Sequence, residues 1–529
     1  MFASKPSKIR QRTVTVPIKK TTTAPIDSAR KASATESRNG ATGSSTKLKS
    51  AASTAPSSRF QLTPSNKTRT QPSASASASA QSRTTERKTL TVSHQRKRKV
   101  TPSTPQWASS DESSDDDNEV VSGSGGRKRQ KTSSSIEPMG LNRCLDPDLK
   151  RRIRYQVATA EGEGGVEVSE KKAGKRAKLI AGLDMSQGEH AKSFKPVFTG
   201  LAKNLVVELQ YPSRSRPEKF EAVVPKDPTN FNPIDDLYFS IDEIIQHYLP
   251  LELSSTLASD MDGPVRLLKR AIAKNSPADF SSALTSFNSL ISSKLADKTI
   301  HRVLDGMHAI PLSLTKCILA QVYQRTVSPR AHLLRRVKGK ETTYGELLPS
   351  FVHTIFHQTG LSSDSVFIDL GSGVGNVVLQ SALQTGAESY GIEIMSTPAE
   401  FANHQASELR ARSKLWNISL GPITLLHGDF LESPAVDAVL KRADVVLVNN
   451  KVFPQELNEQ LLIKFLDLKQ GCRVVSLESF GDGGKGKSQG VRREQSIAGL
   501  FDEEGFRSGT DSVSWAGESV EYWIARKSR

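Results

Sequence analysis

The chain is poor in cysteine and in aromatic residues, and it lacks a long hydrophobic run. Its 529 residues include only three cysteines, Cys144, Cys317 and Cys472, with no Cys-x-x-Cys pair. This spacing excludes a disulfide framework and a cysteine-rich zinc site, and we expect no metal. No run of about 18 apolar residues is present to span a membrane, and the first residues lack the apolar core of a signal peptide. We therefore expect a soluble protein of a reducing, intracellular compartment.

Large apolar residues are scarce in the first 140 residues. Phe2, Phe60 and Trp107 are the aromatics of this segment, and 25 Lys and Arg stand against 10 Asp and Glu. The apolar surface available there is too small to offset the entropy that ordering would cost. We expect residues 1–140 to form a disordered tail that carries +15 of the formal net charge of +17.

The tail contains two short basic clusters, residues 96–99 (RKRK) and 127–131 (RKRQK), on either side of the acidic stretch 111–117 (DESSDDD). Such clusters are read by nuclear import receptors or are attracted to phosphate backbones, although a merely solvated charge run has the same composition. We expect a nuclear protein whose tail binds DNA nonspecifically and in a salt-dependent way. The serines beside the carboxylates are typical of acidophilic kinase sites.

Beyond the tail, the apolar pattern predicts a linker and two folded parts. Residues 141–190 are expected to be a partly ordered linker, and apolar residues at helical spacing predict a mostly helical subdomain over 191–320. From 361 onward, short β-branched runs alternate with helical segments, which is typical of a parallel sheet covered on both faces. The predicted strands are 366–370, 389–394, 423–426, 445–448 and 473–477, with a final hairpin inside 513–525. This pattern indicates an α/β class I methyltransferase domain over 321–529, with a doubly wound, seven-stranded sheet.

A glycine-rich segment, residues 369–376 (DLGSGVGN), follows an apolar strand and opens a helix. Glycines at such a place allow a tight turn and a close approach of the backbone to a ligand. The spacing G-x-G-x-G behind Asp369 differs from the dinucleotide pattern G-x-G-x-x-G, and an acid beside the ligand repels a pyrophosphate but attracts a cation. S-adenosyl-L-methionine carries such a cation, so it is the cofactor that we expect.

Two later strand ends add candidate contacts to this cofactor. Glu393 ends the next strand, 18 residues after Gly375, where a carboxylate can accept hydrogen bonds from ribose hydroxyls. Asp429 and Phe430 follow the third strand, where a carboxylate can accept the adenine amino group and a ring can cover the base. Phe430 alone is also compatible with core packing, so the prediction rests on the three strand ends together.

Four motifs then identify a family. They are residues 369–375, Tyr344-Gly345-Glu346, Val448-Asn449-Asn450 and Ser512-Val513-Ser514-Trp515. With them the chain resembles the Dot-type (disruptor of telomeric silencing) histone H3 lysine-79 methyltransferases of fungi, in detail over about 320–527 and more loosely back to about 195. The resemblance implies a nuclear enzyme without a SET domain that transfers one to three methyl groups from S-adenosylmethionine to a lysine of the nucleosome core. It also implies roles in chromatin regulation, telomeric silencing and the DNA damage checkpoint.

The resemblance assigns roles to individual residues. Those implied to bind the cofactor are Tyr344, Gly345, Glu346, Asp369, Gly371, Gly373, Gly375, Asn376, Glu393, Asp429, Phe430 and Asn449. Asn449, Tyr522 and Tyr344 are the implied catalytic residues, with Asn449 beside the transferable methyl group. Phe453, Trp515 and Tyr522 are implied to wall the channel for the substrate lysine, although packing in the core is a competing role for aromatic residues.

An aromatic channel suits the chemistry, because a lysine ammonium must lose a proton before it can attack. Desolvation lowers the pKa of the amine, and ring faces tolerate the cationic sulfur and the product, so we expect no dedicated general base. Two residues depart from the family pattern: Lys451 replaces an aromatic residue and Glu478 replaces a basic one. The stretch Gly481 to Gly490 is expected to be a flexible loop.

The implied partners are the nucleosome, with histone H3, the H4 tail and ubiquitinated H2B, and the enzyme is expected to be a monomer. Two alternatives remain open. A nucleic-acid amino-methyltransferase would also explain the basic tail, but residues 449–452 read Asn-Asn-Lys-Val instead of Asp/Asn-Pro-Pro-aromatic. A catalytically silent chromatin scaffold is the other alternative, although all the cofactor carboxylates and glycines are present.

Overall fold

The computed structural model describes residues 143–156, 179–259, 261–335, 345–480 and 497–528. The tail of residues 1–140, residues 157–178 of the predicted linker, Tyr344 and the stretch Gly481 to Gly490 lie outside these ranges. Among the described helices, none is long and apolar enough to cross a membrane.

A seven-stranded sheet forms the centre of the C-terminal part, in the order β10-β11-β9-β8-β5-β6-β7. The strands are β5 (Val366–Leu370), β6 (Glu388–Glu393), β7 (Ile423–His427), β8 (Val445–Val448), β9 (Arg473–Ser476), β10 (Phe501–Arg507) and β11 (Glu521–Lys527). Strands β5 to β9 are parallel, whereas β11 runs antiparallel to both β9 and β10. This topology confirms the predicted class I methyltransferase fold.

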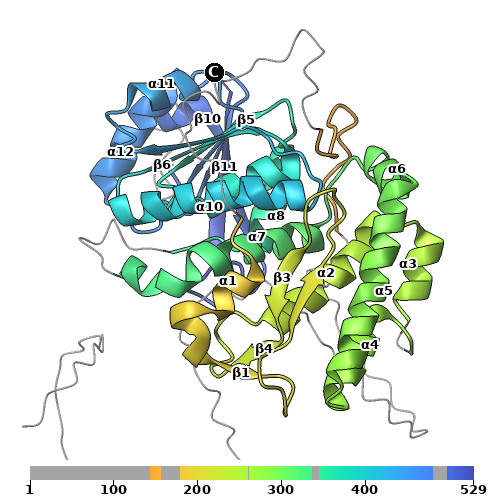
Figure 1. Ribbon diagram of the computed structural model, residues 1–529. Coiled ribbons are helices and arrows are strands. Elements are labelled where there is room, and N and C mark those ends of the chain that lie inside the picture. Colours follow the sequence, from red (N-terminus) through yellow and green to blue (C-terminus); the bar gives the residue numbers. More distant parts are fainter. Residues whose placement is uncertain (1–142, 157–178, 260, 336–344, 481–496, 529) are drawn as a thin grey trace, which may run out of the picture. The chain divides into compact units, whose positions relative to one another are not determined.

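Helices cover both faces of this sheet, which explains why its central strand β8 is an uninterrupted apolar run and why β5 is buried along its whole length. Alternate residues of β5 and β8 face opposite layers: Phe367 packs with α8, whereas Ile368 packs with α11. The covering elements are α8 (Pro349–Thr359), α9 (Asn376–Gln380), the π turn η4 (Ser381–Thr385), α10 (Ser396–Leu415), α11 (Pro434–Leu440), α12 (Gln455–Lys464) and η5 (Phe465–Asp467). Figure 1 shows α8 and α10 crossing in front of the sheet, with α11 and α12 on its other side.

The terminal hairpin lies elsewhere than the sequence predicted. We expected both of its strands inside 513–525, but the first strand is β10, at Phe501–Arg507, and a short turn η6 (Ile497–Leu500) precedes it. Because β10 is an edge strand on which Asp502 and Glu504 are exposed, its sequence lacks the apolar alternation that marks a buried strand. Val513 instead forms isolated bridges to Leu347 and Ala516.

The region before the sheet contains both helices and short strands. Its helical elements are α1 (Gly182–Ser186), η2 (Gly188–Ser193), α2 (Pro233–Tyr248), α3 (Leu251–Leu257), α4 (Pro264–Ala273), α5 (Pro277–Ala296), α6 (Thr299–Asp305), α7 (Leu312–Thr326) and η3 (Ser328–Arg335). Two small antiparallel sheets, absent from our expectation, pair β1 (Phe194–Pro196) with β4 (Val223–Pro225) and β2 (Val206–Leu209) with β3 (Glu218–Glu221). Helix α7 runs across the predicted domain boundary at residue 320, so the two parts share an element.

Local sequence signals start the long helices of this region. Helices α2, α4 and α5 each begin with proline, whose fixed φ suits the first turn. The side chain of Asn232 accepts a hydrogen bond from the amide of Ile234, and that of Ser276 accepts one from the amide of Asp279. These caps satisfy amide groups that a helix start leaves without a partner inside the helix.

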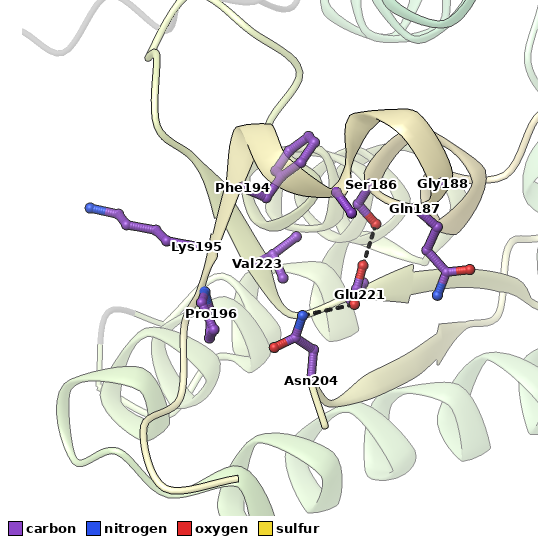
Figure 2. A pocket seen from close by; sticks show the side chains of 10 residues that line it. Ser186, Gln187, Gly188, Phe194, Lys195, Pro196, Asn204, Glu221 and Val223 are labelled. Atoms are coloured by element: carbon purple, nitrogen blue, oxygen red, sulfur yellow. Dashed lines mark hydrogen bonds between the residues drawn. The ribbon is translucent and has the colours of Figure 1, made fainter. Parts of the chain in front are cut away.

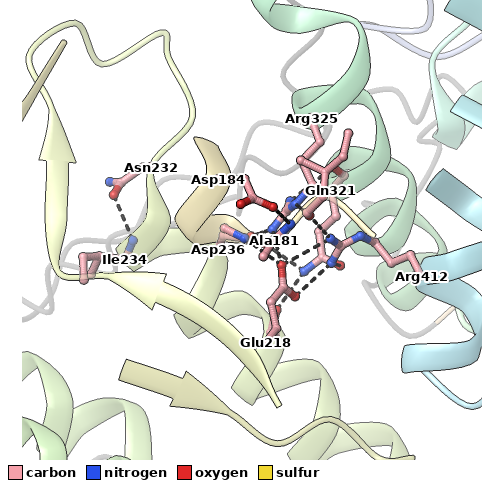
Figure 3. A network of polar contacts seen from close by, with 12 residues as sticks. Ala181, Asp184, Glu218, Asn232, Ile234, Asp236, Gln321, Arg325 and Arg412 are labelled. Atoms are coloured by element: carbon pink, nitrogen blue, oxygen red, sulfur yellow. Dashed lines mark hydrogen bonds and ion pairs between the residues drawn. The ribbon is translucent and has the colours of Figure 1, made fainter. Parts of the chain in front are cut away.

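A buried ionic network joins this region to the sheet (Figure 3). Arg325 of α7 donates to Asp236 of α2 at 2.5 Å and to Glu218 of β3 at 3.0 Å. Arg412 of α10 donates to the second carboxylate oxygen of Glu218 at 3.1 Å and to Gln321 of α7 at 3.2 Å. Both guanidinium groups and the carboxylate of Glu218 are fully buried. These charges therefore stabilise one another in place of water.

Part of the predicted linker packs on the sheet domain. Arg151 inserts its guanidinium against the end of η4 and donates to the backbone oxygens of Leu383 and Gln384 at 2.6 and 2.5 Å. Arg154 bridges to Ile418, and Ile153 is buried in the core between the two parts. Residues 143–156 therefore belong to the folded structure.

Candidate cofactor and substrate site

The glycine-rich segment forms the turn between β5 and α9. Gly371, Gly373 and Gly375 have φ angles of 87°, 55° and 84°, which residues with a side chain rarely adopt. The amides of Gly371 and Ser372 donate to the backbone oxygen of Ile392 on β6, at 3.0 and 2.9 Å. The turn is thus held against the neighbouring strand at the carboxyl edge of the sheet, where ligands of such sheets bind.

Two buried carboxylates lie at this turn. Glu393 accepts hydrogen bonds from the amides of Gly373 and Met395, both at 2.8 Å, so its position is fixed by the backbone. Asp369 is only 4% exposed, and burial, followed by the charge of Glu393, raises the pKa of its carboxyl group to about 8. A buried carboxylate with a raised pKa is a place where a bound cation would be stabilised.

Asn376 gives a second indication of a ligand site. Its Oδ1 accepts a hydrogen bond from Gln405 of α10 at 2.9 Å, whereas its buried Nδ2 has no partner within the structure described. Buried polar groups are nearly always hydrogen-bonded, so this amide is expected to donate to a ligand. A group that offers both a cation and hydrogen-bond acceptors, as S-adenosylmethionine does, fits Asp369 and Asn376.

Two phenylalanines form a wall beside the same turn. The rings of Phe430 and Phe453 are stacked, with their centroids 6.2 Å apart, and the Cζ atom of Phe453 comes within 4.0 Å of where a Cβ on Gly371 would lie. Asp429 accepts a hydrogen bond from the amide of Leu431 at 2.7 Å, which orients the start of the segment that carries Phe430. Phe453, predicted for the lysine channel, thus also adjoins the cofactor side.

Two of the family motifs pair with each other although they lie 168 residues apart. The amide of Glu346 donates to Oγ of Ser514 at 2.9 Å, and the amide of Ser514 donates to the backbone oxygen of Glu346 at 2.9 Å. Trp515 packs on Gly345 so closely that a Cβ there would lie 2.5 Å from its ring. Asn449, at the end of β8, directs its Nδ2 toward the backbone oxygen of Gly345, 3.5 Å away.

Comparison with known proteins identifies the family. The family model described as "Histone methylation protein DOT1" matches residues 323–526. A histone-lysine N-methyltransferase, H3 lysine-79 specific, from Aspergillus fumigatus is 41% identical over 72% of this chain and 74% of its own length. The chain belongs to the DOT1 family of histone methylation proteins. The enzyme of the same description from Emericella nidulans is 39% identical over the same shares of both chains.

A solved RNA methyltransferase from Salinibacter ruber, in complex with S-adenosyl-L-homocysteine, covers 34% of this chain and 92% of its own, with 20% identity and a TM-score of 0.23. That likeness is too low to support an argument. The conclusion rests on family membership and on the sheet order: this DOT1-family chain is a methyltransferase, and its cofactor is S-adenosyl-L-methionine.

The structure brings most of the predicted site residues of this DOT1-family chain to one edge of the sheet. Asp369, Gly371, Gly373, Gly375, Asn376, Glu393, Asp429, Phe430, Asn449 and Phe453 follow the ends of β5 to β8, and the paired segments carry Gly345, Glu346 and Trp515. Tyr344 lies outside the described residues, so its predicted catalytic and cofactor-binding roles stay predictions.

Tyr522 lies in the core. Its ring packs between Phe351 of α8 and Phe506 of β10, and its hydroxyl donates to Gln358 at 2.7 Å. A role in catalysis or in the lysine channel would require this hydroxyl to leave Gln358. The placement favours the competing role in packing, and the catalytic role stays a prediction.

Asn450 is a residue of this site whose role the sequence did not reveal. It is buried, its Oδ1 accepts from the amides of Leu477 and Glu478 at 3.0 and 2.9 Å, and its Nδ2 donates to Asn458 at 3.0 Å. It therefore ties the end of β8 to the end of β9 and holds the backbone next to Asn449. The two consecutive asparagines of the motif were the only signal for Asn450 in the sequence. The contacts in the structure distinguish its role from that of Asn449.

A separate pocket of about 270 Å³ lies in the region before the sheet (Figure 2). Its lining includes Glu221, which accepts hydrogen bonds from Ser186 at 2.7 Å and from Asn204 at 2.9 Å. The pocket is formed by α1, η2, β1, β3, β4 and the segment before β2, and no residue of the cofactor motifs lines it. It is therefore distinct from the cofactor site.

Proposed function

We propose that this chain is a histone-lysine N-methyltransferase that methylates lysine 79 of histone H3 on nucleosomes. The observation that carries the proposal is the meeting of Asn449, Gly345 and Trp515 beside the cofactor turn, in a chain 41% identical to an enzyme named for that specificity. Mono-, di- and trimethylation, and through them a role in silencing, are part of the same proposal.

We assign the cofactor contacts as follows. Asp369 takes the ammonium group and Asn376 donates to an acceptor of the same cofactor, in keeping with the burial of the Asp369 side chain and of the Nδ2 atom of Asn376. Glu393 takes the ribose hydroxyls, since each carboxylate oxygen has a lone pair left beyond its backbone contact. Asp429 and Phe430 take the adenine, and Glu346 lies at the methionine end. When bound, S-adenosylmethionine supplies an electrophilic methyl group on a sulfonium.

The residues at the mouth of the site prepare the substrate amine. The side-chain oxygen of Asn449 can accept a hydrogen bond from a neutral amine and so orient its lone pair. The ring of Trp515, 38% exposed, offers a face to a cationic side chain on its way in. Desolvation between these groups lowers the pKa of the amine, so that water can take the proton.

Partners and location follow from this substrate. The target lysine lies on a folded histone surface, so we propose that nucleosomes are better substrates than free histone H3. We further propose that the protein acts in the nucleus as a monomer, that its basic tail adds nonspecific affinity for DNA, and that the H4 tail and ubiquitinated H2B are further contacts.

Methyl transfer from labelled S-adenosylmethionine to recombinant nucleosomes, free H3 and naked DNA tests the substrate. The site of labelling is mapped by mass spectrometry. We expect label on lysine 79 of nucleosomal H3 and at least a tenfold loss of rate in Asn449→Ala, the order of magnitude for a positioning contact. Asn403→Ala, at an exposed site on α10, is the matched control and should retain the full rate.

Three other outcomes of this experiment would each contradict one part of the proposal. Label on DNA would support the nucleic-acid methyltransferase and refute the histone substrate. Free H3 methylated as fast as nucleosomes would refute the proposed need for a folded surface. Cofactor binding without transfer to any of the three substrates would support the silent scaffold.

A further inference from the structure

Helix α7 contacts two different parts of the molecule with residues of one turn. Gln321 and Arg325, four residues apart and on the same side of the helix, belong to the buried ionic network (Figure 3). Tyr323 lies between them in sequence, and its hydroxyl donates to Oε1 of Glu346 at 2.9 Å. The helix therefore connects the network to the segment that pairs with residues 512–514.

The contact between Tyr323 and Glu346 is enclosed. Tyr323 is 3% exposed and Glu346 is 6% exposed. Glu346 is held from the other side as well, because its amide donates to Ser514 and its backbone oxygen accepts from the amide of that residue. The two hydrogen bonds with Ser514 thus fix the backbone of Glu346, and the hydroxyl of Tyr323 restricts the rotation of its carboxylate.

We propose that Tyr323 is a positioning residue for the cofactor: its hydroxyl holds the carboxylate of Glu346 in the orientation that receives the methionine end of S-adenosylmethionine. This inference rests on the assignment of Glu346 in the proposed function. Arg325 and Gln321 fix the rotation of α7 and so aim Tyr323, which makes the buried network a support of the cofactor site.

The physical basis is preorganisation. A glutamate side chain loses substantial rotational entropy when a ligand orders it, and a partner that orders it beforehand removes that cost from binding. Burial, followed by the charge of Glu346, raises the pKa of Tyr323 well above its usual value, so the phenol stays a donor throughout the working pH range. A hydrogen bond to a charged acceptor is also stronger than one between neutral groups.

Calorimetric binding of two ligands to the full chain tests the proposal. S-adenosylhomocysteine carries the amino-acid end, whereas methylthioadenosine has the same nucleoside and lacks that end. We expect Tyr323→Phe to weaken S-adenosylhomocysteine about tenfold, the fold-change expected for one hydrogen bond to a charged group, and to leave the affinity for methylthioadenosine within about twofold.

Tyr248→Phe is the matched control. Tyr248 is also buried, and its hydroxyl donates to the backbone oxygen of Trp416 at 2.8 Å, so this variant loses a comparable bond away from Glu346. It should leave both affinities unchanged, and the thermal unfolding of both variants shows that the fold is kept. Glu346→Gln is measured in parallel and should weaken S-adenosylhomocysteine selectively.

Three results would overturn the inference, and they differ in what else they refute. If Glu346→Gln weakens S-adenosylhomocysteine but Tyr323→Phe does not, the positioning role is wrong and the proposed site stands. If Tyr323→Phe weakens both ligands equally, its effect is structural. If Glu346→Gln leaves S-adenosylhomocysteine binding intact, the assignment of Glu346 to the cofactor is itself wrong.

Discussion

Lys451 and Glu478, the two residues that the resemblance marked as departures from the family pattern, form an ion pair with each other. They follow the ends of β8 and β9, and Asn450 holds both segments by accepting a hydrogen bond from the amide of Glu478 at 2.9 Å. The sequence suggested two separate irregularities, with a lone cation beside the substrate channel. The contact shows instead that the lysine and the glutamate neutralise each other's charge.

Exchanging the two charges tests this pairing. We expect Lys451→Glu alone to lower the rate on nucleosomes, because two carboxylates then stand together at the rim. The double variant with Glu478→Lys should restore the rate to within about twofold. Both side chains are partly exposed, at 42% and 43%, so the free energy of unfolding should change by about 1 kcal/mol or less in all variants. A double variant as slow as the single one would show that the pairing is unimportant.

The pH dependence of stability tests the environment of Asp369. Its pKa of about 8 in the folded protein exceeds the usual value near 4, so over that window the folded state keeps a proton that the unfolded state has lost. The stability contributed by the protonated form is therefore present at low pH and falls by about 1 kcal/mol per pH unit as pH rises toward 8.

Asp369→Asn cannot ionise, and its urea unfolding curves between about pH 5 and pH 7.5 should show a flatter dependence than those of the native chain. Since a bound cation favours the ionised carboxylate, S-adenosylmethionine should bind more tightly as pH rises over the same range, with release of a proton. Proton release is read from calorimetry in buffers of different ionisation enthalpy. Parallel pH profiles for native chain and variant would contradict the assignment.

Removing Glu218 tests the buried network. Burial opposes its ionisation, but Arg412 and Arg325 outweigh burial and hold its pKa well below the usual range. Glu218→Gln leaves two buried guanidinium groups short of a charge partner, and we expect a loss of about 3–5 kcal/mol in the free energy of unfolding. Glu521→Gln breaks the exposed pair with Arg507 and should cost less than about 1 kcal/mol. Equal effects would mean that the network is not a major source of stability.

A methyl group at Gly345 tests how closely the two paired segments must approach. A Cβ there would lie 2.5 Å from the ring of Trp515, so Gly345→Ala must displace that ring or one of the two segments, at a cost of about 1–3 kcal/mol. We expect methylation of nucleosomes to fall at least tenfold. Gly306→Ala is the control, because the added Cβ would have no neighbour closer than 3.6 Å. An unchanged rate in Gly345→Ala would show that Trp515 does not shape the site.

The sequence predicted the regular part of the fold well, because buried parallel strands are continuous apolar runs with turn residues between them. The predicted strands 366–370 and 445–448 match β5 and β8 to the residue. The error at the hairpin has a physical cause. Strand β10 forms an edge, where exposed acidic residues are tolerated, so its sequence does not show the pattern of a buried strand.

The cofactor side was readable from the sequence because its residues lie at the ends of strands or just after them. Parallel strands place their carboxyl ends at one edge, so Asp369, Glu393, Asp429 and Asn449 had to lie near one another once the strands were recognised. The roles of Tyr522 and Asn450 could not be read in this way. An aromatic ring near a site and one in the core beneath it have the same local sequence, and only the hydroxyl contact with Gln358 separates them.

The sequence by itself determined the family, the sheet, the cofactor turn and the charged character of the tail, because each is encoded in short runs of residues whose spacing reflects local geometry. Only the tertiary structure decided which distant side chains meet. Tyr323 with Glu346, Lys451 with Glu478, and Glu218 with Arg325 and Arg412 are contacts between residues 23 to 194 positions apart. No local pattern encodes such pairs, because their formation depends on how the helices and strands pack around the common core.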